Sequence, residues 1–220
     1  MEVVIQTQNT SLEEADRRII QSAFDDGLVD IFLSTVVLMW AIAPFLSVYL
    51  GDFWSSAIFL PFWGAIYLVL RWIRKNWVKP RAGVVKYGAV RKKKMTAFTW
   101  IMLGLNVLFL ILGLVAFFMP TSPGWTMTIS FALMLLISFS LAGYFLAVTR
   151  FYLYGILLAS GFFVGEWLYQ NFGFSHHGLP VVFGLMSGVI FLTGVYKLVT
   201  FLQKNPLPGE EQMQWKAKNG

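Results

Sequence analysis

Six long runs of apolar residues constrain the fold of this chain more than any other feature. Each is longer than the roughly 18 residues that an α-helix needs to cross about 30 Å of hydrocarbon at a rise of about 1.5 Å per residue. Only 13% of the 220 residues are charged, against about 25% in a typical soluble domain. We therefore predict an all-α, polytopic integral membrane protein in which six transmembrane helices form three hairpins. The predicted segments are 28–50, 53–73, 97–119, 125–148, 151–172 and 180–202.

Polar segments at both ends divide the chain into three parts. We assign residues 1–27 to a cytosolic N-terminal segment, 28–203 to the membrane domain with a basic loop at 74–96, and 204–220 to a cytosolic tail. The first apolar run is longer than the core of a signal peptide, which spans about 7–15 residues, so we expect it to be retained as a membrane segment.

The N-terminal segment contains the pattern of a short amphipathic helix. Ser11 and Glu14 have the spacing of a capping box, in which each side chain satisfies a free N–H at the start of a helix. Apolar residues then recur at helical spacing up to Gly27, which can end the helix. Such a helix either lies on the membrane surface or packs on the protein's own cytosolic loop.

The distribution of positive charge predicts the topology. Residues 71–94 hold ten of the 17 Lys and Arg residues and no Asp or Glu. With six crossings, this stretch lies on the same side as both termini, and the connectors on the opposite side contain no Lys or Arg. Because positive residues in short loops are retained in the cytoplasm, we expect a multi-pass protein of the cell membrane with both termini inside.

The basic loop has three interpretations. It binds anionic lipid headgroups, at about 1 kcal/mol per basic residue near the surface; it binds an acidic cytosolic partner; or it is only a topology signal. Gly83 and Gly88 have the spacing of a phosphate-binding loop, but the Lys and Ser/Thr that should follow are missing, so we reject nucleotide binding. Nucleic acid is disfavoured as a partner because anionic lipid lies so close. The expected binding residues are Lys79, Arg81, Lys86, Arg91, Lys92, Lys93 and Lys94.

Two glycine pairs at a spacing of four predict close helix packing. Gly161 and Gly165 lie in the fifth segment, and Gly184 and Gly188 lie in the sixth. Small residues four apart let two helix backbones approach and gain van der Waals contact. We favour packing of the fifth segment on the sixth within one chain, and a homodimer interface is the competing interpretation.

Glu166 is an acidic residue inside the predicted membrane segment 151–172, near the outer end of that segment. A carboxylate at the bilayer centre costs about 2.5–3.5 kcal/mol on insertion scales, so it faces the bundle or a cavity and is a functional candidate by default. It could form a proton or cation site, or simply bond to a neighbouring helix. His176 and His177 follow after a short loop, and two imidazoles with one carboxylate could bind zinc, although adjacent histidines are expected to point apart.

Two prolines lie in the first predicted hairpin at similar depth. Pro44 and Pro61 each remove a backbone hydrogen bond, which leaves the carbonyls of Trp40 and Ala57 without that donor. Simple kinks are the favoured interpretation, and a backbone-lined substrate site is the alternative. Asn106 is a further polar candidate inside the third segment.

Composition excludes several chemistries and leaves three functions open. The chain has no cysteine, which excludes thiolate catalysis and Cys-ligated metal sites, and we expect no cofactor. Asp25, Asp26 and Asp30 could bind Mg²⁺, but acids at a helix start ordinarily complement the helix dipole. We favour a non-enzymatic scaffold, regulatory or partner subunit, then a small carrier or channel that uses Glu166, and third a lipid-modifying enzyme. The expected partners are membrane lipids, a membrane or cytosolic protein and a second copy of the chain.

Overall fold

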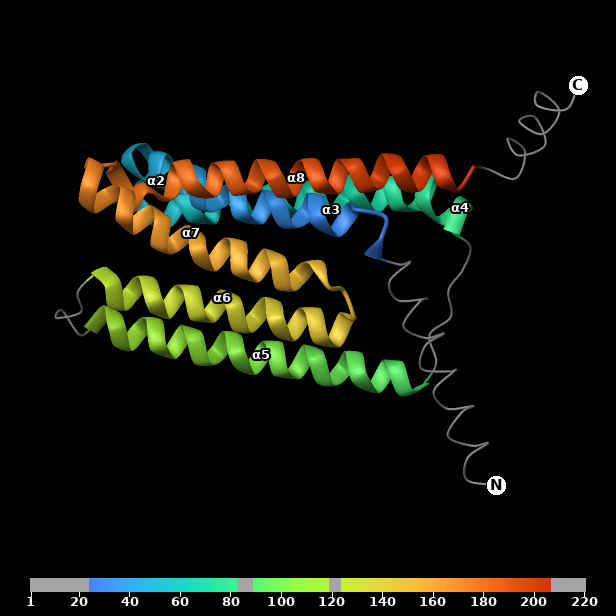
Figure 1. The fold of residues 1–220 in the computed structure, drawn as a ribbon, viewed down its shortest axis with the longest axis horizontal. Helices are drawn as coiled ribbons and strands as arrows, with labels where there is room; N and C mark the ends of the chain where they lie inside the picture. The colour runs from blue at the N-terminus through green and yellow to red at the C-terminus, as the bar shows by residue number, and fades with distance from the viewer. Residues whose placement is uncertain (1–23, 83–88, 119–123, 207–220) are drawn as a thin grey trace, which may run out of the picture. The chain divides into compact units, whose positions relative to one another are not determined.

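The computed structural model describes residues 24–82, 89–118 and 124–206. Every regular element in these residues is helical, as the sequence predicts (Figure 1). The elements are α2 (Leu28–Ala57), α3 (Phe59–Ile73), the π-helix η1 (Arg74–Val78), α4 (Lys79–Ala82), α5 (Ala89–Phe118), α6 (Gly124–Leu146), α7 (Arg150–Phe172), the 3₁₀-helix η2 (Ser175–Gly178) and α8 (Leu179–Lys204). The predicted amphipathic helix lies mostly outside the described residues.

Among the described residues, five stretches are long and apolar enough to cross a membrane, which supports a multi-pass membrane protein. They are Leu28–Gly51, Phe53–Arg81, Thr128–Leu146, Arg150–Phe172 and Ser175–Lys204. The remaining predicted segment, 97–119, overlaps α5, which contains the shorter apolar stretch Thr96–Phe109. A count of six crossings, and the orientation that follows from it, therefore stay predictions.

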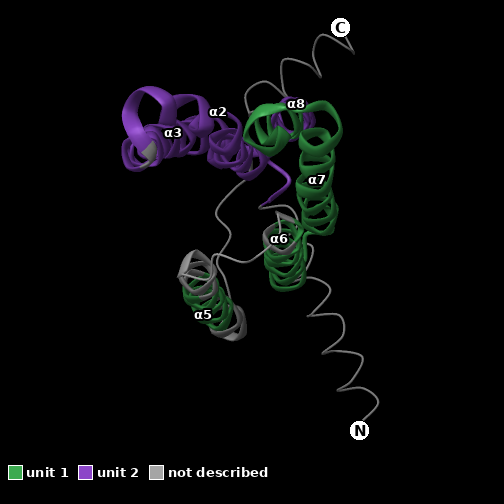
Figure 2. Cartoon of the chain, turned by 90° about the vertical axis from the view of Figure 1, so that its left-hand side faces the viewer, with its two compact units in different colours: residues 1–21, 86–186 green, residues 22–85, 187–220 purple. Residues whose placement is uncertain are grey.

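The chain forms two compact units, coloured separately in Figure 2. One comprises residues 1–21 and 86–186, and the other comprises residues 22–85 and 187–220. Because α8 crosses this division, its residues 179–186 belong to the first unit and its remaining residues belong to the second.

In the unit of residues 22–85 and 187–220, α2 and α3 form a hairpin that bends at Gly51. Its φ of 75° and ψ of 163° are open to glycine and costly for other residues. Trp63 on α3 donates a hydrogen bond across the hairpin to the carbonyl of Thr35 at 3.4 Å. The remainder of α8 packs against α2, where the Ser187 hydroxyl donates to the carbonyl of Ser34 at 2.9 Å.

The two prolines of this hairpin produce only modest irregularity. The helical ladder is interrupted at Ile58 because Pro61 has no N–H to donate to the carbonyl of Ala57. Ile58 nevertheless keeps right-handed dihedrals of −61° and −23°, so the chain continues almost straight into α3. Pro44 lies inside α2 without a break in the helix. This geometry fits the simple-kink interpretation.

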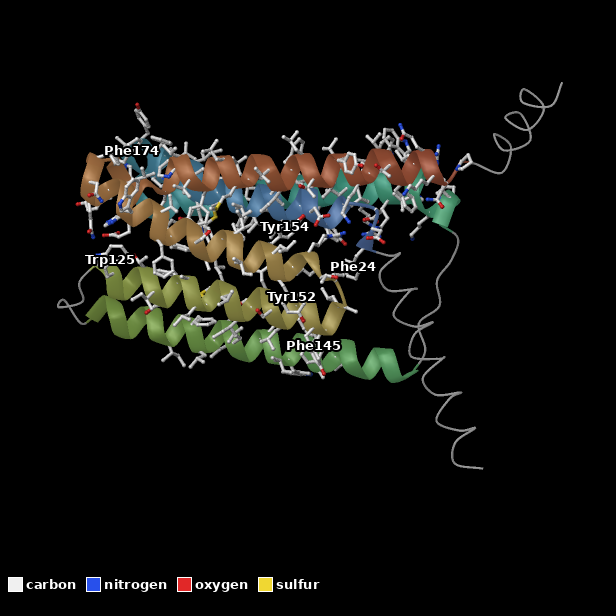
Figure 3. The ribbon with its side chains drawn as sticks, in the orientation of Figure 1. Phe24, Trp125, Phe145, Tyr152, Tyr154 and Phe174 are labelled. Carbon is white, nitrogen blue, oxygen red and sulfur yellow. The ribbon has the colours of Figure 1, made fainter. Side chains whose placement is uncertain are left out.

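In the unit of residues 86–186, α5, α6 and α7 pack in chain order, with aromatic rings at the contacts (Figure 3). Phe98 of α5 contacts Phe145 of α6, with ring centroids 5.5 Å apart. Phe131 of α6 stacks on Phe162 of α7 at 5.7 Å. The Tyr152 ring covers Gly143, where a Cβ would lie 2.8 Å from it. These contacts hold α7 in place and so position the turn at its end.

Candidate functional site

The end of α7 is shaped by a run of left-handed backbone. Gly173 has a φ of 67° and donates its N–H to the carbonyl of Tyr169 at 3.0 Å, which ends the helix with a glycine cap. His176 and His177 follow with φ values of 53° and 54°, and Gly178 with 63°. Histidine tolerates this region better than most residues, but two in succession cost about 1 kcal/mol or more each unless other contacts hold them.

Those contacts come from α7. Gly165 is buried, and a Cβ on it would lie 2.7 Å from the carbonyl oxygen of His177. In return, a Cβ on Gly178 would lie 2.7 Å from the carbonyl oxygen of Gly165. The backbones of helix and turn therefore touch directly, and this close approach requires glycine on both sides.

Glu166 lies beside this contact, and we call Glu166, Tyr169, Gln170 and His177 the Glu166 cluster. The Glu166 residue is 4% exposed. Its Oε1 accepts a hydrogen bond from Nε2 of Gln170 at 2.8 Å, and its Oε2 lies 2.8 Å from Nδ1 of His177. The ring of Tyr169 lies against the imidazole, with centroids 4.3 Å apart. Since an ionised carboxylate only accepts, Nδ1 of His177 carries the hydrogen in that state.

The structure brings together two residues that the sequence analysis singled out. Glu166 is buried, and His177 contacts its carboxylate. Among the described residues, no group of three His, Asp or Glu side chains could hold a metal ion. Gln170 and Tyr169 are absent from the sequence prediction; the spacing of four between Glu166 and Gln170 on a helix was the available signal.

The two glycine motifs behave differently from one another. Gly161 is buried near Met186 and Phe183 of α8, so α7 does contact the first turns of α8. A Cβ on Gly188, by contrast, would meet nothing within 4 Å, and Gly188 is exposed. Gly184 is half-buried. Packing of the fifth segment on the sixth through Gly188 therefore stays a prediction, and the close partner of Gly165 is the turn at His177 and Gly178.

A first prediction follows from this asymmetry. We expect Gly165→Ala to lower the free energy of unfolding by about 1–3 kcal/mol, because the added methyl meets a backbone carbonyl that cannot move aside. Gly161→Ala should cost less, because its methyl would meet the flexible end of Met186 at 2.8 Å. Thermal unfolding in detergent measures both, with Gly188→Ala as the neutral control. Equal losses at 161 and 165 would contradict this assignment.

A second candidate lies on the helix that runs through α3, η1 and α4. Arg71, Lys75 and Lys79 are exposed and follow one another at intervals of four residues. Trp72 and Trp77 are exposed on the same stretch, with ring centroids 6.1 Å apart. We call these five residues the basic face. On a continuous α-helix, residues five apart point about 140° apart; the wider π-helical turn of η1 allows the two tryptophans to meet.

Two other arginines of this stretch are used inside the protein. Arg74 bonds to Oδ2 of Asp26, through Nη2 at 2.7 Å and Nε at 3.2 Å. Arg81 is half-buried, and its Nη1 donates to the carbonyls of Leu202 at 2.7 Å and Asn205 at 3.3 Å, at the end of α8. Arg81 thus caps α8, where a cation is favoured, and its role in lipid or partner binding stays a prediction. The side chains of Lys86 and of residues 91–94 lie outside the described residues.

The acidic residues at the start of α2 are likewise part of the fold. Asp26 has a 3% exposed side chain and accepts from the N–H of Leu28 at 3.0 Å as well as from Arg74. Asp25 pairs with Lys197 of α8 at 3.5 Å, and Asp30 is fully buried in the first turn of α2. The contacts of Asp25 and Asp26 are those of acids that stabilise the start of a helix and its neighbours.

The remaining candidates are Asn106, in the unit of residues 86–186, and Trp40 and Pro44, in the unit of residues 22–85 and 187–220. Asn106 is exposed on α5 and donates to the carbonyl of Met102 in its own helix at 2.7 Å. Trp40 and Pro44 are half-buried on α2. In the part of the chain that the structure describes, no ligand-binding site is recognisable around Asn106 or around the prolines.

Comparison of the chain with protein-family models, with curated proteins and with solved structures gives no match. The arguments on function therefore depend on the geometry of this chain.

Proposed function

We propose that this multi-pass membrane protein is a non-enzymatic scaffold or partner subunit whose cytosolic side binds anionic lipid headgroups through the basic face. The observation that carries the proposal is the pairing of three exposed cations with two exposed tryptophans on one helical stretch that contains no acidic residue. Cations near the surface gain about 1 kcal/mol each from anionic lipid. Tryptophan rings favour the headgroup region because they are apolar with one polar edge.

The anchoring of this stretch supports the same proposal. Arg74 and Arg81 tie it to Asp26 and to the end of α8. The helix that carries the exposed cations is therefore fixed before a headgroup binds. Binding then restricts only the side chains of these cations and not the backbone. The orientation of the basic face toward the cytoplasm is the one that the positive-inside rule gives.

The test is the lipid that the protein retains. Purified protein is mixed with vesicles of equal phosphatidylglycerol and phosphatidylcholine, extracted, and its bound lipid measured by mass spectrometry. We expect enrichment of phosphatidylglycerol that falls at least tenfold when Arg71, Lys75 and Lys79 are all replaced by Gln. Tenfold corresponds to about 1.4 kcal/mol, and three cations at about 1 kcal/mol each contribute up to about 3 kcal/mol. High salt should reduce the enrichment as well, because exposed charges are screened.

The matched control preserves charge. The triple variant Arg71→Lys, Lys75→Arg, Lys79→Arg should retain phosphatidylglycerol as the wild type does. If the Gln variant keeps the full enrichment, the basic stretch is only a topology signal and the proposal fails. If lipid retention is unchanged but a cytosolic protein no longer co-purifies, the acidic-partner interpretation replaces it.

The carrier function is the second candidate, and the buried carboxylate of Glu166 in a membrane-length helix is the observation in its favour. It ranks second because both oxygens of that carboxylate already have partners within the protein. Ion flux through proteoliposomes that is lost in Glu166→Gln would reverse this order. For the third candidate, a lipid-modifying enzyme, the described residues supply no metal-binding group.

A further inference from the structure

The Glu166 cluster joins α7 to the turn that follows it, and the backbone conformation of that turn is unfavourable by itself. Glu166 and Gln170 belong to α7, whereas His177 belongs to the turn that follows Gly173. Within that turn, four of the six residues from 173 to 178 have positive φ, two of them non-glycine. A turn of this kind is stable only while its contacts hold it. Side chains link this turn to α7 where His177 contacts Glu166 and Tyr169.

The contact of His177 with Glu166 joins two groups that can each bind a proton, and one of them lies in the connector that the predicted topology places outside the membrane. Glu166 has a side chain that is 5% exposed, whereas that of His177 is 53% exposed. A proton from solvent can therefore reach the imidazole while the carboxylate stays enclosed. We propose that the Glu166–His177 pair is a proton-binding site whose occupancy sets how tightly residues 173–178 are held on α7. This inference depends on neither candidate function.

The chemistry is a simple proton gain. With the carboxylate ionised, the neutral imidazole donates Nδ1–H to Oε2 and has its Nε2 lone pair available. A proton taken from water onto Nε2 makes the ring an imidazolium, and the same 2.8 Å contact becomes an ion pair. Hydrogen bonds between charged partners are roughly twice as strong as neutral ones. The face of Tyr169, 4.3 Å from the ring, also favours a cation.

The surroundings leave this pair as the titrating unit. The ionisable groups of α7 near His177 are Glu166 and Tyr169, and Gln170 is neutral. The turn itself contributes His176, which is exposed. Residues 179–186 of α8, whose Leu179 packs on Gly165, contain no ionisable side chain. Gain of a proton by the pair should therefore tighten the turn, and its loss should loosen the turn.

The absence of cysteine from the sequence makes a direct test simple. Ser175→Cys places one exposed thiol in the turn, to which a nitroxide spin label is attached. In lipid nanodiscs, we expect the ratio of mobile to immobile label in the electron paramagnetic resonance spectrum to fall about fivefold between pH 8 and pH 6. The same labelled protein with His177→Gln should lose this response, because Gln donates a hydrogen bond to Glu166 but does not titrate.

The matched control is the neighbouring residue. His176→Gln in the same labelled background should keep the pH response of the wild type. Glu166→Gln should abolish the response as His177→Gln does, and the exposed position of His177 keeps the test valid if the Glu166 variant fails to fold. A wild type without a pH response, a response that survives His177→Gln, or a response lost with His176→Gln would each overturn the proposal.

Discussion

Replacing Gly27 with alanine is expected to lower the free energy of unfolding by about 3 kcal/mol, the sum of a steric and a conformational cost. Gly27 has a φ of 72°, and a Cβ on it would lie 2.2 Å from the carbonyl oxygen of Gly194 and 3.0 Å from the backbone nitrogen of Leu198. Both neighbours are backbone of α8, so they cannot rotate away. The methyl would therefore force α2 and this part of α8 apart. Unfolding by sodium dodecyl sulfate in mixed micelles, followed by circular dichroism, measures the loss.

Two other glycines separate the causes. Gly173 has a φ of 67° in the same left-handed region and open space around it, so Gly173→Ala reports the conformational cost alone, about 1 kcal/mol. Gly194→Ala reports the steric cost, because its Cβ would lie 2.8 Å from the backbone nitrogen of Ile31. If Gly27→Ala costs no more than Gly173→Ala, the approach of the two backbones is not tight.

Replacing Arg74 with methionine is expected to cost about 2–3 kcal/mol, which is less than the loss for a fully buried pair because Arg74 is 42% exposed. The substitution leaves the enclosed carboxylate of Asp26 with one N–H donor, that of Leu28, in place of three. It also releases the basic stretch from the start of α2. The same unfolding titration measures the effect, and Lys75→Met, which changes an exposed cation on the same stretch, should stay within about 0.5 kcal/mol of the wild type.

A double variant isolates the charge. Asp26→Asn together with Arg74→Met should recover part of the stability lost by Arg74→Met alone. Asp26→Asn removes the buried charge that has lost its partner, and the Asn side chain keeps an acceptor for the N–H of Leu28. Additive losses in the double variant would show that the two side chains act independently, contrary to the 2.7 Å contact.

The helices themselves were predictable because membrane length and apolar composition leave few alternatives. Predicted segment 28–50 begins where α2 begins, and 151–172 ends where α7 ends. The bend at Gly51 falls in the predicted connector. The apolar runs do not predict which of the described basic residues are exposed and which are bonded within the fold. The sequence around Arg81 does not distinguish it from the neighbouring basic residues, because its role depends on a contact with the carbonyl of Leu202 in α8.

The sequence predicted which residues were candidates for a site, but it did not predict the contacts between them. Glu166 stands out because a carboxylate inside an apolar run requires an explanation, and the histidines stand out by their rarity. Their contact depends on the left-handed dihedrals at 176 and 177, for which glycine at 173 and 178 was the available hint. The meeting of Trp72 and Trp77 depends on a π-helical turn, which no hydrophobic periodicity announces.

That π-helical turn also affects how the length of the chain between its two anchors can change. Residues 74–78 accommodate one residue more than an α-helical turn would, so the turn itself can absorb the loss of one residue, whereas a change of one residue at 79 or 80 would rotate everything that follows by about 100°. Arg81 would then face away from the end of α8 while Arg74 still faced Asp26. The segment between these arginines should therefore accept exchange of its exposed side chains far more readily than an insertion or deletion at 79 or 80.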